Sequence, residues 1–304
     1  MRTVLAHRVG LTVAVAVAVA VAVGAAACGT GSSRDASERP AIVVTTSVLG
    51  DVVQHLVGDD VGTLVVMPAG SNPHDFAPSA RQVEAIRSAE VLVVNGLDQE
   101  ATLRDTIDAA ERAGTVVIRA TDGVEALGSD SHFFTDPVRM RQAAGYLAER
   151  LAVDVKGLDT PEYHSRVAAY LAALDQLDAE VASILAPIPN ERRTLVTYHG
   201  AFNYFADRYG FTVLGTVVPG RSSLAGASAA ELSALAARMK QEGITEVFTD
   251  QSSPDRLAKT LAAEGTKTDL VELYTESLGP PGSDASTYID LVRTNARRIA
   301  AALA

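Results

Sequence analysis

The stretch that decides the fold is Pro161 to Leu185, PEYHSRVAAYLAALDQLDAEVASIL, near the middle of the 304-residue chain. It contains no Gly, and no Pro after its first residue. Its apolar residues recur at helical spacing, at Val167, Tyr170, Leu171, Leu174, Leu177, Val181 and Leu185. At a rise of about 1.5 Å per residue, a helix of this length is a rod of roughly 37 Å. The pattern predicts one long helix, inside a linking segment that we place at residues 156–188.

On the N-terminal side of this helix, short apolar runs alternate with helix-like stretches. The apolar runs are Ala41–Thr46, Gly62–Met67, Val91–Asn95 and Thr115–Ile118. The helix-like stretches are Asp51–Val57, Ser79–Ala89 and Glu100–Ala113. Continuous apolar strands that alternate with helices are typical of parallel strands buried on both faces. We predict an N-terminal lobe at residues 41–155.

The same alternation returns on the C-terminal side, at residues 189–304. The apolar runs are Thr194–Tyr198, Phe211–Thr216, Glu246–Thr249 and Asp269–Tyr274, and the helix-like stretches are Ala201–Tyr209, Ala229–Glu242, Pro254–Glu264 and Ser286–Leu303. The predicted fold is therefore α/β, with two lobes joined by one long linking helix. Each lobe is a roughly four-stranded parallel sheet with helices on both faces. Such a linker should permit less movement than extended hinge strands.

Residues 1–27 are typical of a secretory signal peptide rather than of a folded segment. Arg2 and Arg8 give a basic start, and a nearly uninterrupted apolar run follows from Leu11 to Ala27. This run is shorter than the roughly 20 residues that span a membrane. Ala25-Ala26-Ala27 then precedes Cys28, the only cysteine, and resembles the lipobox of bacterial lipoproteins. We predict lipidation of Cys28; the alternative is an ordinary signal peptide or an uncleaved anchor with an incidental cysteine.

Residues 28–40 continue from Cys28 into a small, polar run without a hydrophobic pattern, which predicts a flexible tether. Removal of residues 1–27 takes two arginines and no acids, so 24 basic and 37 acidic residues leave a formal charge of −13. This balance argues against nucleic acid as a partner. It is compatible with cation capture, but many exported proteins share it.

Three of the six histidines share a predicted location. His74 lies in a loop after a predicted strand, His132 lies in a loop before a helix that starts near Pro137, and His199 follows the run TLVTY. In open parallel α/β sheets, ligands bind beyond the carboxyl ends of the strands. The three imidazoles are therefore candidates to converge between the lobes. His55 and His164 lie in predicted helices and are interpreted as surface or packing residues.

A carboxylate from the second lobe would complete the set. Glu276 follows one predicted strand and Asp250 ends another, so either residue is a candidate. Three nitrogens and one oxygen suit tetrahedral Zn²⁺, and imidazole with carboxylate also serves Mn²⁺. Asp250 also reads as an ordinary turn and cap residue. Because the candidates are dozens of residues apart, spacing alone is weak evidence for a site.

The local strings carry more information than the spacing. NPHDFAPS around His74, HFFTDP from His132, HGAFNY from His199 and TESL around Glu276 occur in the order found in the cluster A-I family, and the chain resembles these zinc/manganese solute-binding proteins of ABC transporters along its whole length. The resemblance implies two α/β lobes, one linking helix and one divalent metal held by His74, His132, His199 and Glu276. It also implies a lipid-anchored monomer outside the cytoplasmic membrane, with a permease and an ATPase as partners and no enzymatic activity. A further role as an adhesin stays open.

The sequence departs from the family pattern at two places. The carboxylate is Glu276 where the family usually has Asp. The stretch Thr121–Ser131 is short and lacks the histidines that many zinc-specific members carry. Three nitrogen ligands nevertheless favour zinc over manganese. The rival interpretations are an exported metallohydrolase that uses the same three histidines, and a binding protein for an organic solute.

Overall fold

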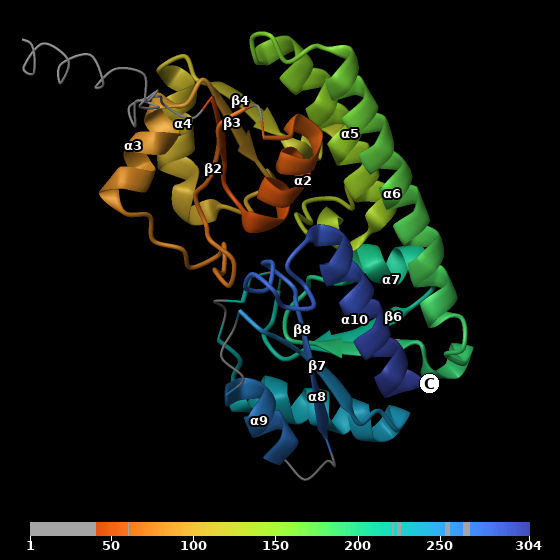
Figure 1. Cartoon of the computed structure of the whole chain (residues 1–304). Coiled ribbons are helices and arrows are strands. Elements are labelled where there is room, and N and C mark those ends of the chain that lie inside the picture. The colour runs from red at the N-terminus through yellow and green to blue at the C-terminus, as the bar shows by residue number, and fades with distance from the viewer. Residues whose placement is uncertain (1–40, 60, 221, 224–225, 253–255, 264–267) are drawn as a thin grey trace, which may run out of the picture. The chain divides into compact units, whose positions relative to one another are not determined.

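The computed structural model of the chain describes residues 41–59, 61–220, 222–223, 226–252, 256–263 and 268–304. The predicted signal peptide, Cys28 and the tether lie outside the described residues. Among the described residues, none of the helices combines the length and the apolar character that a membrane span requires. Residues 41–304 contain two parallel four-stranded sheets, as the sequence predicts (Figure 1).

The first sheet has the order β2-β1-β3-β4 and all its strands are parallel. The strands are β1 (Ile42–Val44), β2 (Thr63–Val65), β3 (Val91–Val94) and β4 (Val116–Arg119). Side chains on the two faces enter different apolar clusters. Val44 and Val93 pack with α2 (Ser47–Val57) and α5 (Pro137–Asp154), whereas Val43 and Leu92 pack with α3 (Ala80–Ser88) and α4 (Arg104–Arg112). Helices therefore cover both faces, which is why the strands read as continuous apolar runs.

The second sheet repeats this design with the order β6-β5-β7-β8. Its strands are β5 (Thr194–Thr197), β6 (Thr212–Thr216), β7 (Glu246–Asp250) and β8 (Asp269–Leu273). Leu195 and Phe248 face the cluster formed with α7 (Asn203–Tyr209) and α10 (Tyr288–Leu303). Val196 and Val247 face the cluster formed with α8 (Ala229–Glu242) and α9 (Arg256–Ala263). Four short 3₁₀ turns complete the described part of the chain: η1 (Ala101–Leu103), η2 (Ala120–Gly123), η3 (Phe133–Thr135) and η4 (Asn190–Arg192).

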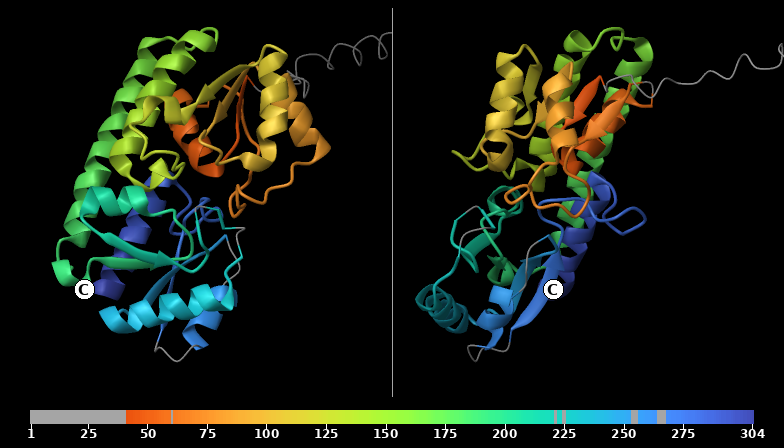
Figure 2. Two further views of the ribbon diagram at one scale, coloured as in Figure 1. Left: turned by 180° about the vertical axis from the view of Figure 1, so that it is seen from behind. Right: turned by 90° about the vertical axis from the view of Figure 1, so that its left-hand side faces the viewer.

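The linking helix α6 runs from Pro161 to Leu185, the range that its periodicity predicts. Thr160 caps its start by accepting a hydrogen bond from the Tyr163 amide, and Pro161 occupies the first turn, where its missing N–H costs nothing. Figures 1 and 2 show α6 alongside both lobes, packed on α2 and α5 of the first lobe and on α10 of the second. One apolar cluster thus continues from lobe to lobe through the buried side of α6.

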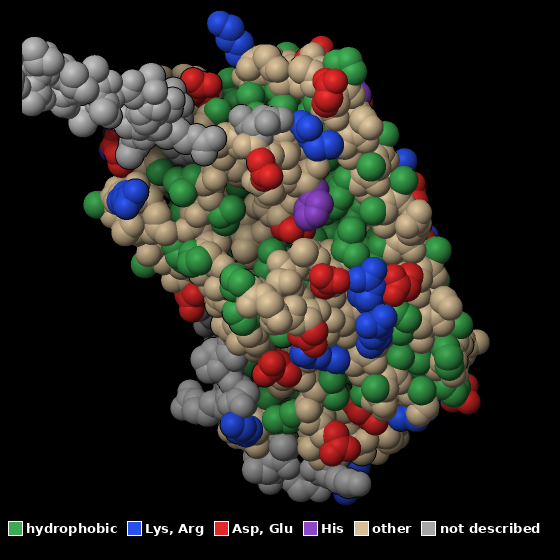
Figure 3. All heavy atoms as spheres, in the orientation of Figure 1, with side chains coloured by type: hydrophobic (Ala, Val, Ile, Leu, Met, Phe, Trp, Pro, Cys, Tyr) green, Lys and Arg blue, Asp and Glu red, His purple; other side chains and the backbone are tan. Residues whose placement is uncertain are grey.

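Ion pairs reinforce the outer side of this packing. Arg293 of α10 contacts Glu180 of α6 at 2.8 Å, and Arg141 of α5 contacts Asp175 of α6 at 2.7 Å. On the face in Figure 3, acidic and basic side chains lie side by side over α10 and the neighbouring part of α6. Because these pairs are partly exposed, each contributes at most about 1 kcal/mol. The apolar cluster is therefore the main connection between the linking helix and the lobes.

Two helices begin more than two residues away from their predicted starts. Helix α2 begins at Ser47, four residues before the predicted Asp51, because Thr46, two residues after the end of β1, caps the helix by accepting a hydrogen bond from the Leu49 amide. The predicted helix Glu100–Ala113 is divided into η1 and α4. Its start is displaced because the loop before it holds Leu97 and Asp98 at positive φ.

Candidate metal centre

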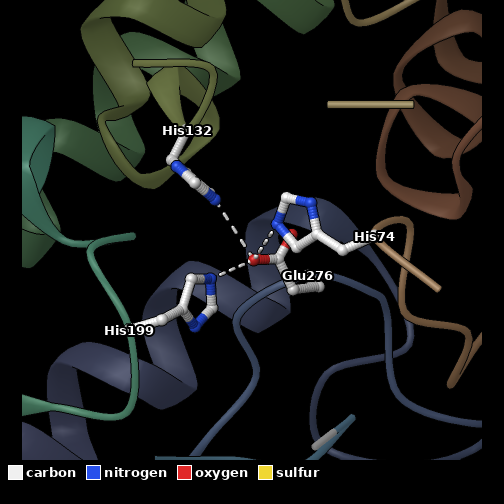
Figure 4. Close-up of side chains that lie close together, drawn as sticks. All are labelled: His74, His132, His199 and Glu276. Carbon is white, nitrogen blue, oxygen red and sulfur yellow. Dashed lines mark hydrogen bonds and ion pairs between the residues drawn. The ribbon is translucent and has the colours of Figure 1, made fainter. Parts of the chain in front are cut away.

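Four buried side chains from both lobes meet beyond the carboxyl ends of the strands. His74 lies in the loop between β2 and α3, His132 immediately before η3, His199 after β5, and Glu276 after β8. Each offers a ligand atom, and these atoms all lie within 4.8 Å of one another. Figure 4 shows the three imidazoles pointing at the same carboxylate. The structure therefore brings together the three predicted histidines and Glu276.

The convergence is on a single atom. The Nε2 atoms of His199, His132 and His74 lie 2.5, 3.2 and 3.5 Å from Oε1 of Glu276. The exposed fractions are 8% for His74, 0% for His132, 1% for His199 and 2% for Glu276. Nε2 of His74 has no hydrogen-bond partner among the described residues. A buried polar atom without a partner is costly, so an additional partner at this point would stabilise the arrangement.

His132 is fixed by a second carboxylate. Its Nδ1 donates to Oδ1 of Asp130 at 2.7 Å, which directs Nε2 into the site. Asp130 is held in turn by the amide of Asn203, which donates to Oδ2 at 2.8 Å. The hydroxyl of Tyr204 donates to the Asp130 carbonyl at 2.8 Å. The run that starts at His199 thus serves two purposes, because it also positions the neighbouring histidine from the first lobe.

The loops that carry the other two histidines are held by backbone contacts. The carbonyl of His199 accepts a hydrogen bond from the Thr197 hydroxyl at 2.8 Å, directly after β5. The amide of His74 donates to the side-chain oxygen of Asn72 at 3.0 Å. Asn72 also donates to the hydroxyl of Ser223 at 2.6 Å, which connects the His74 loop with the second lobe. These contacts hold the backbone of both loops beside the site.

The Glu276 loop crosses to the first lobe. The hydroxyls of Ser277 and Ser47 lie 2.9 Å apart, and the Leu278 amide donates to the Ser47 hydroxyl at 3.1 Å. The amide of Gly70 donates to the Leu278 carbonyl at 3.1 Å. Glu276 belongs to the second lobe by sequence, but hydrogen bonds to both lobes hold its loop.

The charges of the site are strongly coupled. Burial alone would lower the pKa of His132, but the carboxylates of Glu276 and Asp130 outweigh burial and raise this pKa to about 9. Burial would raise the pKa of Glu276, yet the charges of His132 and His199 and their hydrogen bonds hold it well below its usual value. At neutral pH the centre is therefore an ionised carboxylate that faces at least one protonated imidazole.

The remaining candidates lie apart from the group of four. Asp250 is buried at the end of β7, where its carboxylate accepts hydrogen bonds from the amide and hydroxyl of Ser252, as a turn residue does. Burial and the nearby charge of Glu276 raise the pKa of Asp250. His55 stacks on Tyr170 with ring centroids 4.8 Å apart, and His164 contacts Asp159 on the surface. These two histidines have packing and surface positions, as the sequence predicts.

Sequence reasoning missed three supporting residues. Asp130 and Asn203 orient His132, and Gln99 donates from Nε2 to Oε2 of Glu276 at 2.6 Å. An acid two residues before a candidate histidine, as in Asp130-Ser131-His132, was a readable signal. Gln99 offered none, because it lies 177 residues from Glu276 in sequence.

A pocket of about 570 Å³ leads to the centre from outside. His74 lines it together with Asp98, Ser129, Ser131 and Ser222. Leu97 and Ala101 line the same pocket, so polar oxygens and apolar side chains share the approach to the buried imidazoles.

The donor set fits one divalent transition-metal ion. Three imidazole nitrogens and one carboxylate oxygen match tetrahedral zinc, and the same donor types serve manganese. Together, the two-lobed parallel α/β fold, the single linking helix and this centre between the lobes define a class of metal-binding solute-binding proteins.

Comparisons with known proteins place the chain within this class. It belongs to the ZnuA family, described as zinc-uptake complex component A, periplasmic, whose model matches residues 42–302. It is similar to the zinc-binding protein TroA of Treponema pallidum, with 30% identity over 90% of this chain and 92% of TroA. It is also similar to the manganese-binding lipoprotein MntA of Halalkalibacterium halodurans, with 28% identity over 88% of this chain and 89% of MntA.

The solved structure of TroA from Treponema pallidum has the same fold. It superposes with a TM-score of 0.81 at 30% identity, and the match covers 88% of this chain and 99% of the TroA chain. The iron ABC transporter substrate-binding lipoprotein MtsA of Streptococcus pyogenes is similar at 24% identity, over 90% of this chain and 92% of MtsA. The names of these three relatives give zinc, manganese and iron as their metals.

Proposed function

We propose that this protein captures one divalent transition-metal ion outside the cytoplasmic membrane and delivers it to the permease and ATPase of an ABC importer. The ligands are His74, His132, His199 and Glu276. The observation that carries the proposal is the convergence of three buried Nε2 atoms on one carboxylate oxygen. Zinc is the favoured cargo and manganese the next, because three nitrogen donors suit zinc better.

Capture exchanges protons for the metal. The imidazoles bind metal only when neutral at the coordinating nitrogen, so the proton on Nε2 of His132 leaves as the ion enters. Asp130 keeps the proton on Nδ1 and so fixes the tautomer that presents Nε2. Glu276 supplies the negative charge that offsets half of the cation's charge.

Release requires local loop movement more than a wide hinge opening. Helix α6 packs on both lobes, and the Glu276 loop is hydrogen-bonded to Ser47 and Gly70 of the first lobe. A movement of the loops that carry His74 and Glu276 would remove two ligands without separating the lobes. We infer that docking on the permease drives this movement.

The same proposal includes export and anchoring. Residues 1–27 are the signal peptide, Cys28 is lipidated, residues 28–40 are the tether, and residues 41–155, 156–188 and 189–304 are the two lobes with their linker. MntA, a relative, is a lipoprotein by name. Two or more acyl chains on Cys28 would anchor a monomer stably at the outer face of the cytoplasmic membrane.

With Glu276 as its fourth ligand, a tetrahedral ion held by these residues would have no open position for an activated water. This supports transport rather than hydrolysis. Screening the zinc-loaded protein for esterase, phosphatase and amidase activity tests this part: turnover that His199→Ala abolishes would contradict it.

The central experiment is metal analysis of the chelator-stripped protein after dialysis against zinc. We expect one zinc per chain, loss of binding in His199→Ala, and normal binding in the control His164→Ala, whose imidazole lies on the surface. Less than half an equivalent of metal in the wild-type protein, or undiminished binding in His199→Ala, would contradict the proposed site.

A further inference from the structure

The two oxygens of Glu276 have different partners. Oε1 faces the three imidazoles, whereas Oε2 accepts a hydrogen bond from Nε2 of Gln99 at 2.6 Å. Gln99 is 1% exposed, so water does not compete for this contact. Each carboxylate oxygen has two lone pairs, so Gln99 takes one acceptor position of Oε2 and competes with a metal ion for this oxygen.

The Gln99 amide has a defined orientation. Its Oε1 accepts a hydrogen bond from the Ser131 hydroxyl at 2.5 Å, on the side away from Glu276. An ionised carboxylate only accepts hydrogen bonds, so the NH₂ group of Gln99 has to face Glu276. The Ser131 carbonyl is itself bonded by the Asn95 side chain at 3.0 Å. The amide is therefore held from both ends.

The loop that carries Gln99 adopts a strained backbone to place it. Gly96, Leu97 and Asp98 have φ values of 93°, 50° and 62°. A left-handed conformation is unfavourable for a non-glycine residue, because its Cβ approaches the following carbonyl oxygen. The buried carboxylate of Glu100 holds this turn, because its Oε1 accepts from the Asn95 amide and from the Thr45 hydroxyl, both at 2.6 Å. Strain maintained by buried contacts is typical of functional positions.

We propose that Gln99 is a specificity-determining residue that restricts Glu276 to binding metal through Oε1 alone. This inference rests on the proposed function. With one carboxylate oxygen and three nitrogens, the site offers four donors, the number that zinc prefers. Manganese favours more oxygen donors and six-coordinate geometry. Gln99 therefore disfavours manganese by withholding the second oxygen.

The test compares zinc and manganese dissociation constants in the wild-type protein and in Gln99→Leu, which removes the hydrogen bond and keeps a similar volume. We expect the ratio of the manganese to the zinc dissociation constant to fall by about tenfold in the variant. This is the lower end of the effect that the loss of an outer hydrogen-bond partner has on a metal site. X-ray absorption of the zinc-loaded variant should show a fifth, oxygen donor that the wild-type protein lacks. Gln99→Met serves if Gln99→Leu does not fold.

The matched control is Gln54→Leu, at a half-buried glutamine of α2 whose amide bonds the Gly58 carbonyl. It should leave the ratio of the two constants unchanged. The Gln99 variants could instead bind metal normally, with a ratio of manganese to zinc dissociation constants within about threefold of wild type. This result would overturn the role of Gln99 but not the proposed function, since the loss of an outer partner has a larger effect. A wild-type protein that binds neither metal would overturn the proposed function as well.

Discussion

At the scale of single residues, substitution of Asp130 tests whether metal binding by His132 depends on the carboxylate that accepts its Nδ1 hydrogen bond. In Asp130→Asn the acceptor for Nδ1 loses its charge, so the imidazole is less basic and less firmly oriented. We expect zinc affinity to fall by about 10- to 100-fold. Competition against a fluorescent chelator measures the change. Asp207→Asn, at a surface aspartate paired with Arg139, is the control. Equal affinities in the two variants would contradict the proposed role of Asp130.

The ion pair of His132 with Glu276 makes the free energy of unfolding of the metal-free protein depend on pH. The pKa of His132 is about 9 in the folded protein, whereas an ordinary histidine has a pKa of 6.5. The resulting stability is complete below pH 6.5 and is lost as the pH rises through 9. At about 1.4 kcal/mol per pKa unit, the loss is on the order of 3 kcal/mol.

Urea unfolding of the stripped protein at pH 6.5 and pH 9 measures this loss. His132→Gln should lack the pH dependence, because its amide does not titrate. The zinc-loaded protein should not follow the metal-free curve either, since its imidazoles are neutral ligands. A metal-free protein as stable at pH 9 as at pH 6.5 would show that the ion pair contributes nothing.

The sequence identifies the ligand types at this scale but not their supports. His74, His132 and His199 could be chosen because strand-end loops in parallel sheets converge at one edge. Gln99 could not be chosen, because its role depends on a loop with positive φ at Leu97 and Asp98. That conformation depends on the hydrogen bond between Thr45 and Glu100, two residues that are far apart in sequence, so it could not be predicted.

At the scale of elements, α6 could be predicted to the residue because several local signals agree. Thr160 caps the helix, Pro161 begins it, and the apolar stripe faces helices from both lobes. Helix α2 was less predictable, because Thr46 continues an apolar strand and its capping role depends on the turn that follows. Where a residue belongs equally well to two patterns, packing decides the boundary.

Removal of the cap of α6 should change the stability of the protein but not its zinc affinity. Thr160→Ala removes the acceptor for the Tyr163 amide and should lower the free energy of unfolding by about 1 kcal/mol, with Thr160→Ser close to wild type. Zinc affinity should stay the same, because the cap lies at the start of the linking helix α6 and its hydrogen bond joins Thr160 to Tyr163, not to a ligand loop. Urea denaturation and a chelator competition measure the two quantities. A large loss of affinity would mean that α6 sets the ligand geometry.

At the scale of the whole molecule, the relative placement of the lobes could not be derived from sequence. Periodicity predicts a rod and two sheets, but not that α2, α5 and α10 pack on the same rod. Hydrogen bonds that join Gly70 and Ser47 with the Glu276 loop add a second connection between the lobes. Two connections at different distances from the centre leave little freedom for a hinge.

We therefore expect the molecule to change little when its metal is removed. The radius of gyration of residues 41–304 by small-angle scattering should shift by less than about 1 Å, the scale of movement in pre-organised binding proteins. Zinc at 100 times its dissociation constant should still stabilise the fold by about 2.7 kcal/mol, because only the folded state has the site. Ser277→Ala is the informative variant, because it weakens the second connection by removing the hydrogen bonds of the Ser277 hydroxyl with Ser47 and Gly70. If Ser277→Ala increases the radius of gyration of the metal-free protein without weakening zinc binding, α6 alone does not restrain the lobes. If removal of zinc increases the radius of gyration of the wild-type protein by several ångströms, the two connections together do not restrain the lobes.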